Sequence, residues 1–241
     1  MRAVTLLLDG LPVSVYFYCE TPCDISALVG EVGCGGVAVA LYPERDADFG
    51  AICLDENGVL LKETYLPLMV LSYFFGAVRG LPGVSLDIVY NGNVYEMAVM
   101  REAQKFSVNL GKCKLICAKT IKFEDDVELS VDVTECGCVS ASAVVYDSDL
   151  FDESHLRHLG ALSGIGFSAP SLAVSYDGDL KIKCIGDIPF YSAVTIAVST
   201  LIRRGIELTC GKTVARVNGI EHRISVENGR LIFYPNIKYL S

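Results

Sequence analysis

Two acidic residues, Glu63 and Asp187, occupy equivalent places in the chain, each shortly before a long uncharged run that starts with a proline. A carboxyl group whose pKa is raised by burial can act as a general acid or base, so both are candidate catalytic residues. A second interpretation is that they are helix-start residues whose negative charge complements the helix dipole. We prefer the dipole interpretation and keep the catalytic one open.

The start of a buried helix is itself a place where chemistry could occur. Its first N–H groups have no intrahelical partner, and its dipole favours an anion. If the two helix starts open onto one cleft, that cleft would suit a carboxylate or phosphate. Thr64 is also a weak catalytic candidate. The expected ligand-binding residues are Thr64, Tyr65, Tyr191 and Ser192, with Leu66, Ile188 and Phe190 at the same mouth.

The elements that would position these residues are the runs from Thr64 to Gly80 and from Ile188 to Gly205. Each has proline in or before its first turn and ends with arginine followed by glycine, which are helix start and stop signals. A helix that is apolar all round should be buried, and both runs are shorter than the roughly 20 residues that a membrane span needs. They predict two core helices wrapped by sheet, although two unrelated halves with one ordinary buried helix each would give a similar pattern.

The strand pattern around the two runs is repeated. Apolar and alternating segments bounded by turn signals predict strands, and a surface helix, strands, a hairpin, a buried helix and further strands follow in that order in each half. The sequence thus predicts an internal duplication. The fold class is α+β with two pseudo-symmetric lobes, 1–120 and 121–241, each a β-barrel-like sheet around a buried central helix, facing each other across a cleft. Strands are expected at 3–9, 13–19, 37–42, 48–54, 59–62, 84–91, 94–101, 105–109, 112–119, 127–133, 141–146, 171–176, 180–185, 213–217, 222–226 and 230–234, and surface helices at 25–31 and 151–162.

Composition excludes several classes of function. The net charge of −9 opposes binding to nucleic acid and to anionic membrane surfaces, and 51% hydrophobic residues suffice for a sizeable core. The N-terminal apolar run is short and lacks a signal cleavage site, so a cytoplasmic location is expected.

The ten cysteines are expected to be reduced and to behave as small buried hydrophobes, since no secretory signal is recognised. None of the close pairs has C-x-x-C spacing and no histidine lies near them in sequence, so no metal site is expected. His155 and His158 are expected on a solvated helix face.

At four places the sequence resembles the diaminopimelate epimerase family. Residues 46–62 resemble its aspartate-phenylalanine strand and the hairpin that follows, and residues 77–82 resemble the exit from its first helix. Residues 142–150 and 224–234 resemble its H-A-V-V-F segment and closing hairpin. Related racemases and the phenazine-biosynthesis isomerases share this fold. The resemblance implies a cofactor-independent enzyme in which two cysteines, one per lobe at the start of a buried helix, move a proton across the α-carbon of an amino acid. Family enzymes are often dimers, so a homodimer is one assembly that this chain could form.

The sequence departs from that pattern at the catalytic motifs. The two C-G-x-G motifs fall on residues 64–67 and 188–191, which contain neither cysteine nor glycine, and the histidine of H-A-V-V-F is Ser142. The bulky Tyr65, Phe190 and Tyr191 would fill the space that a substrate carboxylate needs. None of the cysteines falls on a catalytic position.

Three hypotheses follow. In the first, the chain is a catalytically degenerate protein, or pseudoenzyme, that has lost two-cysteine racemisation and binds a small carboxylate or amino acid in the interlobe cleft. In the second, it is an isomerase or epimerase of a small amino-acid-like substrate that uses Glu63 and Asp187 in place of cysteines. In the third, it is an interaction protein whose function lies at a dimer surface.

Overall fold

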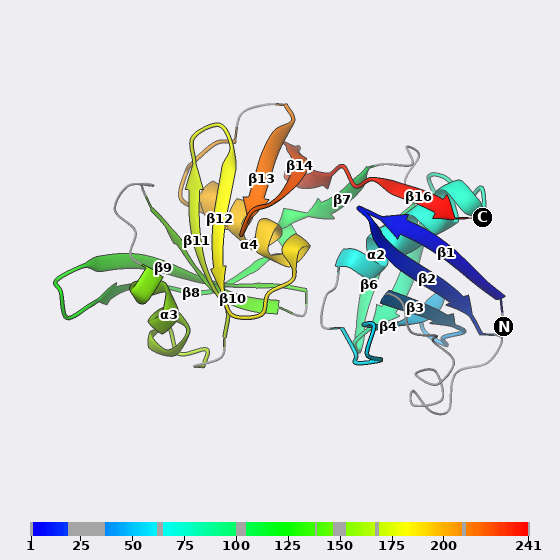
Figure 1. Ribbon diagram of the computed structural model, residues 1–241, viewed down its shortest axis with the longest axis horizontal. Coiled ribbons are helices and arrows are strands. Elements are labelled where there is room, and N and C mark those ends of the chain that lie inside the picture. Colours follow the sequence, from blue (N-terminus) through cyan, green and yellow to red (C-terminus); the bar gives the residue numbers. More distant parts are fainter. Residues whose placement is uncertain are drawn as a thin grey trace. The chain divides into compact units, whose positions relative to one another are not determined.

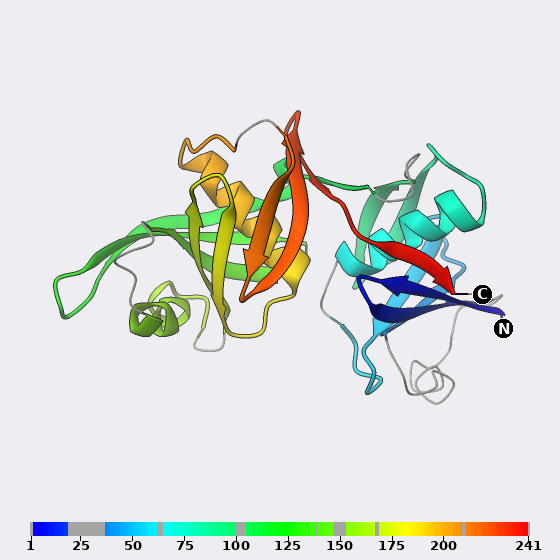
Figure 2. The ribbon, with the colours of Figure 1, turned by 45° about the horizontal axis from the view of Figure 1, so that its top comes forward.

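The computed structural model describes residues 2–18, 37–61, 65–99, 105–137, 139–146, 153–166, 169–208 and 211–240. Its chain divides into two compact units. Unit 1 comprises Met1–Phe106 and Tyr234–Ser241, and unit 2 comprises Ser107–Phe233. Each unit is built on one mixed β-sheet with few helices, so the predicted α+β class is confirmed (Figures 1 and 2). Within the described part of the chain, no helix combines the length and apolarity needed to cross a bilayer.

Unit 1 contains a seven-stranded sheet in the order β16-β1-β2-β3-β4-β5-β6. Its buried helix, α2 (Tyr65–Tyr73), continues as a π-helical segment, η1 (Phe74–Val78). Seven of the nine residues of α2 are buried, as expected for a helix that is apolar on every side. The strands are β1 (Arg2–Leu8), β2 (Leu11–Phe17), β3 (Val37–Tyr42), β4 (Phe49–Leu54), β5 (Ser85–Tyr90), β6 (Asn93–Ala98) and β16 (Ile237–Leu240).

Unit 2 contains a nine-stranded sheet in the order β7-β15-β14-β13-β12-β11-β10-β9-β8. Its central helix, α4 (Phe190–Arg203), has eleven buried residues and contacts each of the strands from β9 to β13, so the sheet curves around it. The strands are β7 (Phe106–Asn109), β8 (Lys114–Lys122), β9 (Glu128–Cys136), β10 (Val139–Val145), β11 (Ser171–Tyr176), β12 (Leu180–Ile185), β13 (Thr213–Val217), β14 (Ile220–Glu227) and β15 (Arg230–Phe233). A short 3-10 helix, η2 (Leu110–Lys112), joins β7 to β8.

Strand directions alternate in the same way in both sheets. In unit 1, β2 is parallel to β3 and β4 to β5, with antiparallel pairs between and beside them. In unit 2, β10 is parallel to β11 and β12 to β13, again with antiparallel pairs between and beside them. Parallel neighbours need a crossover connection, and α2 and α4 each provide one. The amphipathic helix α3 (Glu153–Leu162) provides another, between β10 and β11.

Several strand predictions differ from the structure. Of the segment expected as a strand at 59–62, the described residues 59–61 form a single bridge, between Leu54 and Leu60. The last strand, β16, was not predicted; it pairs with β1 and therefore returns the C-terminal residues to unit 1. Residue 120, the expected boundary between lobes, lies inside β8 of unit 2. The helix expected at 25–31 lies outside the described residues.

Candidate functional site

The start of α4 is the best-described part of the predicted site. Pro189 precedes the helix in an extended conformation, and its carbonyl accepts the first helical hydrogen bond, from Ala193 N–H at 2.9 Å. Pro189, the N-cap residue, contributes no side-chain cap. The backbone at this end carries the positive end of the helix dipole, and anion binding there stays a prediction.

Aromatic side chains fill the space at this helix start. The ring of Tyr191 meets Phe233 edge-on at 5.2 Å between centroids, and meets Phe190 in the same geometry at 5.4 Å. The ring of His222, on β14, lies 4.9 Å from Phe190 and 5.4 Å from Tyr191. Tyr191 is 6% exposed and Phe233 is fully buried. This aromatic cluster (Phe190, Tyr191, His222 and Phe233) belongs to unit 2 alone. Tyr191 and Phe233 are part of the core of that unit, whereas Phe190 and His222 are half-buried.

The predicted site residues differ in how they are placed. Tyr191 and Ser192 are buried in the first turn of α4, and Tyr65 is buried at the first position of α2 in unit 1. Asp187 is exposed on the short connection between β12 and α4, so it lacks the burial that the general acid–base hypothesis requires. Glu63 and Thr64 lie outside the described residues.

Sequence reasoning gave His222 no role beyond its place in a strand. The alternation along β14 predicts that His222 and Ile224 share a face. Ile224 is fully buried and His222 is half-buried, so this alternation was the available signal. Ser142, which the sequence resemblance aligned with a histidine, is fully buried. Its hydroxyl forms a hydrogen bond with that of Ser163, which also donates to the Gly160 carbonyl at 3.2 Å.

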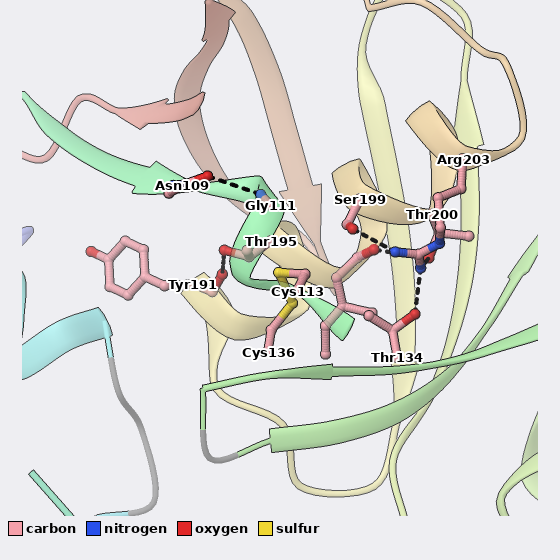
Figure 3. The surroundings of a disulfide bond; sticks show 11 residues. Asn109, Gly111, Cys113, Thr134, Cys136, Tyr191, Thr195, Ser199, Thr200 and Arg203 are labelled. Atoms are coloured by element: carbon pink, nitrogen blue, oxygen red, sulfur yellow. Dashed lines mark hydrogen bonds between the residues drawn. A yellow bond between two sulfur atoms is a disulfide. The ribbon is translucent and has the colours of Figure 1, made fainter. Parts of the chain in front are cut away.

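The opposite end of α4 carries a polar cluster that the sequence did not predict. Asp132, on β9, is 3% exposed, and its Oδ1 accepts a hydrogen bond from Arg204 Nη2 at 2.5 Å. Its Oδ2 lies 3.6 Å from Arg203 Nε, and Arg203 also donates to Ser199 Oγ at 2.7 Å and to Thr134 (Figure 3). Burial lowers the pKa of the Arg203 guanidinium, and the Asp132 charge opposes that shift. The two arginines were expected only as a helix stop signal.

One expectation about the cysteines is wrong, because Cys113 and Cys136 form a disulfide (Figure 3). Since Lys114 pairs with Glu135 in the β8–β9 ladder, the residues immediately beyond them lie opposite each other, and their Cα atoms are 4.5 Å apart. Cys53 is a buried thiol, as predicted. Burial raises the pKa of the Cys184 thiol to about 12, which keeps it protonated. The cysteines at 19, 23, 34, 138 and 210 lie outside the described residues.

The expected solvation of His155 is also wrong, whereas His158 is exposed as predicted. The His155 side chain is 12% exposed, lies 4.4 Å from the Phe123 ring and pairs with Asp125 at 2.8 Å. The hydrophobic residues under α3 draw this histidine against the sheet. Among the described residues, no group of three or more His, Cys, Asp or Glu side chains is arranged to hold a metal ion.

Comparison with known proteins gives a fold but no sequence match. No protein-family model matches the chain, and no curated protein does. A phenazine biosynthesis PhzF-family protein from Enterococcus faecalis matches with a TM-score of 0.61 at 11% identity, over 100% of this chain and 98% of that one. A probable proline racemase from Agrobacterium radiobacter K84, solved with bound carbonate, matches with a TM-score of 0.54 at 12% identity, over 99% and 92%. A methylitaconate-delta-isomerase matches with a TM-score of 0.56 at 10% identity, over 99% and 94%.

These three neighbours, a phenazine biosynthesis protein, a probable proline racemase and an isomerase, share the fold of this chain over 92–98% of their own length. The two-lobed fold predicted from the sequence is therefore confirmed. At this level of identity the likeness shows the fold alone, and the chemistry of the neighbours does not transfer with it.

Proposed function

We propose that this chain is a catalytically degenerate relative of the diaminopimelate epimerases, a pseudoenzyme that binds a small carboxylate or amino acid without racemising it. The observation that carries the proposal is the aromatic cluster at the start of α4. The side chains that follow Ile188 and Pro189 are Phe190 and Tyr191, and Tyr191 is packed against Phe233. A ring in that position can contact a ligand but supplies neither a thiolate base nor a thiol acid.

The nearest described thiol in sequence supports the same conclusion. Cys184 lies on β12, just before α4, and its pKa of about 12 leaves almost none of it as thiolate near neutral pH. A thiol that stays protonated does not abstract a proton from an α-carbon.

The matched strand directions of the two sheets support an internal duplication as the origin of the fold. In both units the second of two parallel crossovers carries the buried helix, α2 or α4. In this proposal the chain inherited two helix starts suited to binding an anion, then lost the catalytic side chains while keeping the fold. Binding would use backbone N–H groups and needs no cofactor.

Solvent-exchange experiments test the loss of catalysis. The full chain would be incubated in deuterated water with proline, diaminopimelate and a panel of amino acids and small carboxylates, and α-proton loss would be followed by NMR. We expect exchange no faster than in buffer, with an active two-cysteine racemase as the positive control. Exchange abolished by Asp187→Asn or Glu63→Gln would replace this proposal with the non-cysteine isomerase.

Binding is tested separately with the same panel. A thermal-shift screen would identify ligands, and NMR of labelled protein would show whether the amides of residues 190–193 respond. We expect a carboxylate to shift these resonances, because the dipole of α4 favours an anion there. If no compound binds, the binding proposal fails and the interaction-protein hypothesis takes its place.

A further inference from the structure

β8 forms an open edge of the nine-stranded sheet of unit 2. It pairs with β9 on one side, and within the described residues no strand pairs with its other side. An edge strand presents a row of backbone N–H and C=O groups that can template an added strand. At nine residues, β8 is longer than the five or six residues of a typical strand.

The edge also exposes apolar surface. Leu115 is 44% exposed and Ile116 is 51% exposed. The register shifts between Leu115, opposite Thr134, and Cys117, opposite Val133, so Ile116 is the extra residue of a bulge. Two adjacent aliphatic side chains on a free edge can be covered by the side chains of an added strand.

Charge is the most distinctive property of this segment. Residues 112–122 carry four lysines and no acidic residue, in a chain whose net charge is −9. Lys122 pairs with Asp126 at 3.0 Å, and Lys119 donates to the Leu162 carbonyl at 3.3 Å. Lys112 and Lys114 are both exposed. The β8 segment itself thus carries only positive charge, although β9 places Glu135 opposite Lys114 and Glu128 opposite Lys122. The exposed lysines of this segment favour an acidic partner.

The strand is fixed at both ends before any partner arrives. The Cys113–Cys136 disulfide links it to β9 at one end. At the other end the Phe123 N–H donates to the Val127 carbonyl at 2.8 Å, which closes the turn. A strand that is already held in register loses little conformational entropy when another strand is added. Less of the favourable contact energy is therefore cancelled by the cost of ordering the strand.

We propose that β8 is a docking edge for an extended acidic segment of a partner protein, which adds to the sheet as a further strand. A second copy of this chain fits less well. Antiparallel pairing of two β8 strands about Ala118 would place Lys114 opposite Lys122, and like charges directly opposite are destabilising. The proposal is independent of the small-molecule function of α4.

A labelled peptide with alternating glutamate and valine tests the proposal by fluorescence anisotropy, with the full, oxidised chain as the binding protein. We expect saturable binding that weakens with salt. The double variant Lys112→Glu, Lys114→Glu should lower the affinity about tenfold. Lys238→Glu, on the edge strand β16 of unit 1, is the matched control and should leave the affinity unchanged. Thermal melts would establish that each variant remains folded.

Two further measurements separate strand addition from general attraction between charges. A peptide of equal charge in which proline replaces each valine keeps only the glutamate N–H groups, and proline is disfavoured within a ladder. It should bind at least about tenfold more weakly. Hydrogen exchange of β8 amides should slow with the first peptide only. The proposal is overturned if both peptides bind equally or if neither binds. It is also overturned if the chain dimerises through β8 and the dimer strengthens on charge reversal, because the lysines would then serve to block edge pairing.

Discussion

Asp132→Asn hardly changes the shape of the side chain, yet the structure predicts a large loss in the free energy of unfolding. The Asp132 side chain is 4% exposed and is the shared counter-ion of Arg203 and Arg204, whose side chains are 23% and 32% exposed. Asparagine keeps the volume of the side chain but removes its charge. It leaves two guanidinium groups beside each other at the end of α4 with no counter-ion in this cluster.

The expected magnitude follows from burial. Breaking a buried ion pair by removing one partner costs roughly 3–5 kcal/mol. Since a quarter to a third of each arginine side chain reaches water, we expect the lower end, about 3 kcal/mol. A loss of that size lowers the melting temperature of a domain of this length by roughly 6–12 °C.

Urea unfolding monitored by circular dichroism would measure this loss, because urea, unlike guanidinium, does not screen charges. Asp126→Asn is the matched control. Asp126 pairs with Lys122 at 3.0 Å but its side chain is 87% exposed, and asparagine tolerates its positive φ of 65°. This control should lose no more than about 0.5 kcal/mol.

Salt provides a second check, since about 1 M NaCl should leave most of the Asp132→Asn difference intact, whereas an exposed pair is screened. The reasoning is refuted if Asp132→Asn unfolds within about 1 kcal/mol of the wild type, or if Asp126→Asn loses as much.

Three other predictions follow from single side chains. The hydrogen bond and charge of Lys183 lower the pKa of Glu153 in the folded protein. The stability that the ionised Glu153 contributes is therefore present above its unfolded pKa and is lost as the pH falls through its folded pKa. Glu153→Gln should reduce the pH dependence of the unfolding free energy between about pH 3 and pH 6. Gly160→Ala should destabilise by about 1–3 kcal/mol in thermal melts despite alanine's helix propensity, because its Cβ would lie 2.6 Å from the Ala169 carbonyl oxygen. Cys184, with a pKa of about 12, should be alkylated roughly 1,000-fold more slowly in the native than in the urea-unfolded chain at about pH 8, as measured by mass spectrometry; equal rates would contradict its burial.

The features that the sequence predicts well are those whose cause is local. The Asn91-Gly92, Asn218-Gly219 and Asn228-Gly229 turns each place both residues at positive φ, the conformation that those dipeptides favour in hairpins. The two buried helices were likewise identified from proline at the start, arginine and glycine at the end, and no charge between. Each signal lies within a few residues of the structure that it predicts.

The features that sequence analysis missed depend on pairing between distant segments. The Cys113–Cys136 pairing requires the β8–β9 register, including the bulge at Ile116, and no local pattern specifies that register. β16 was missed because its pairing with β1 joins the two ends of the chain. Residues 236–240 carry no alternation that outweighs the preceding Tyr234-Pro235.

Side chains at both ends of α4 fix this helix within the sheet of unit 2. Its start is packed by Tyr191 against Phe233, and its end is tied to Asp132 on β9 through Arg203 and Arg204. Small residues in the first turn of a helix leave room for a substrate at the backbone N–H groups, whereas large side chains there restrict that room to a small ligand. A helix fixed by large side chains at one end and a buried ion pair at the other contributes mainly to the stability of the sheet around it. Under the loss of catalysis proposed above, the central helix of unit 2 mainly stabilises the sheet around it and keeps only its start for a small anion. The lysine-rich edge of the same sheet is where the proposed protein partner would dock.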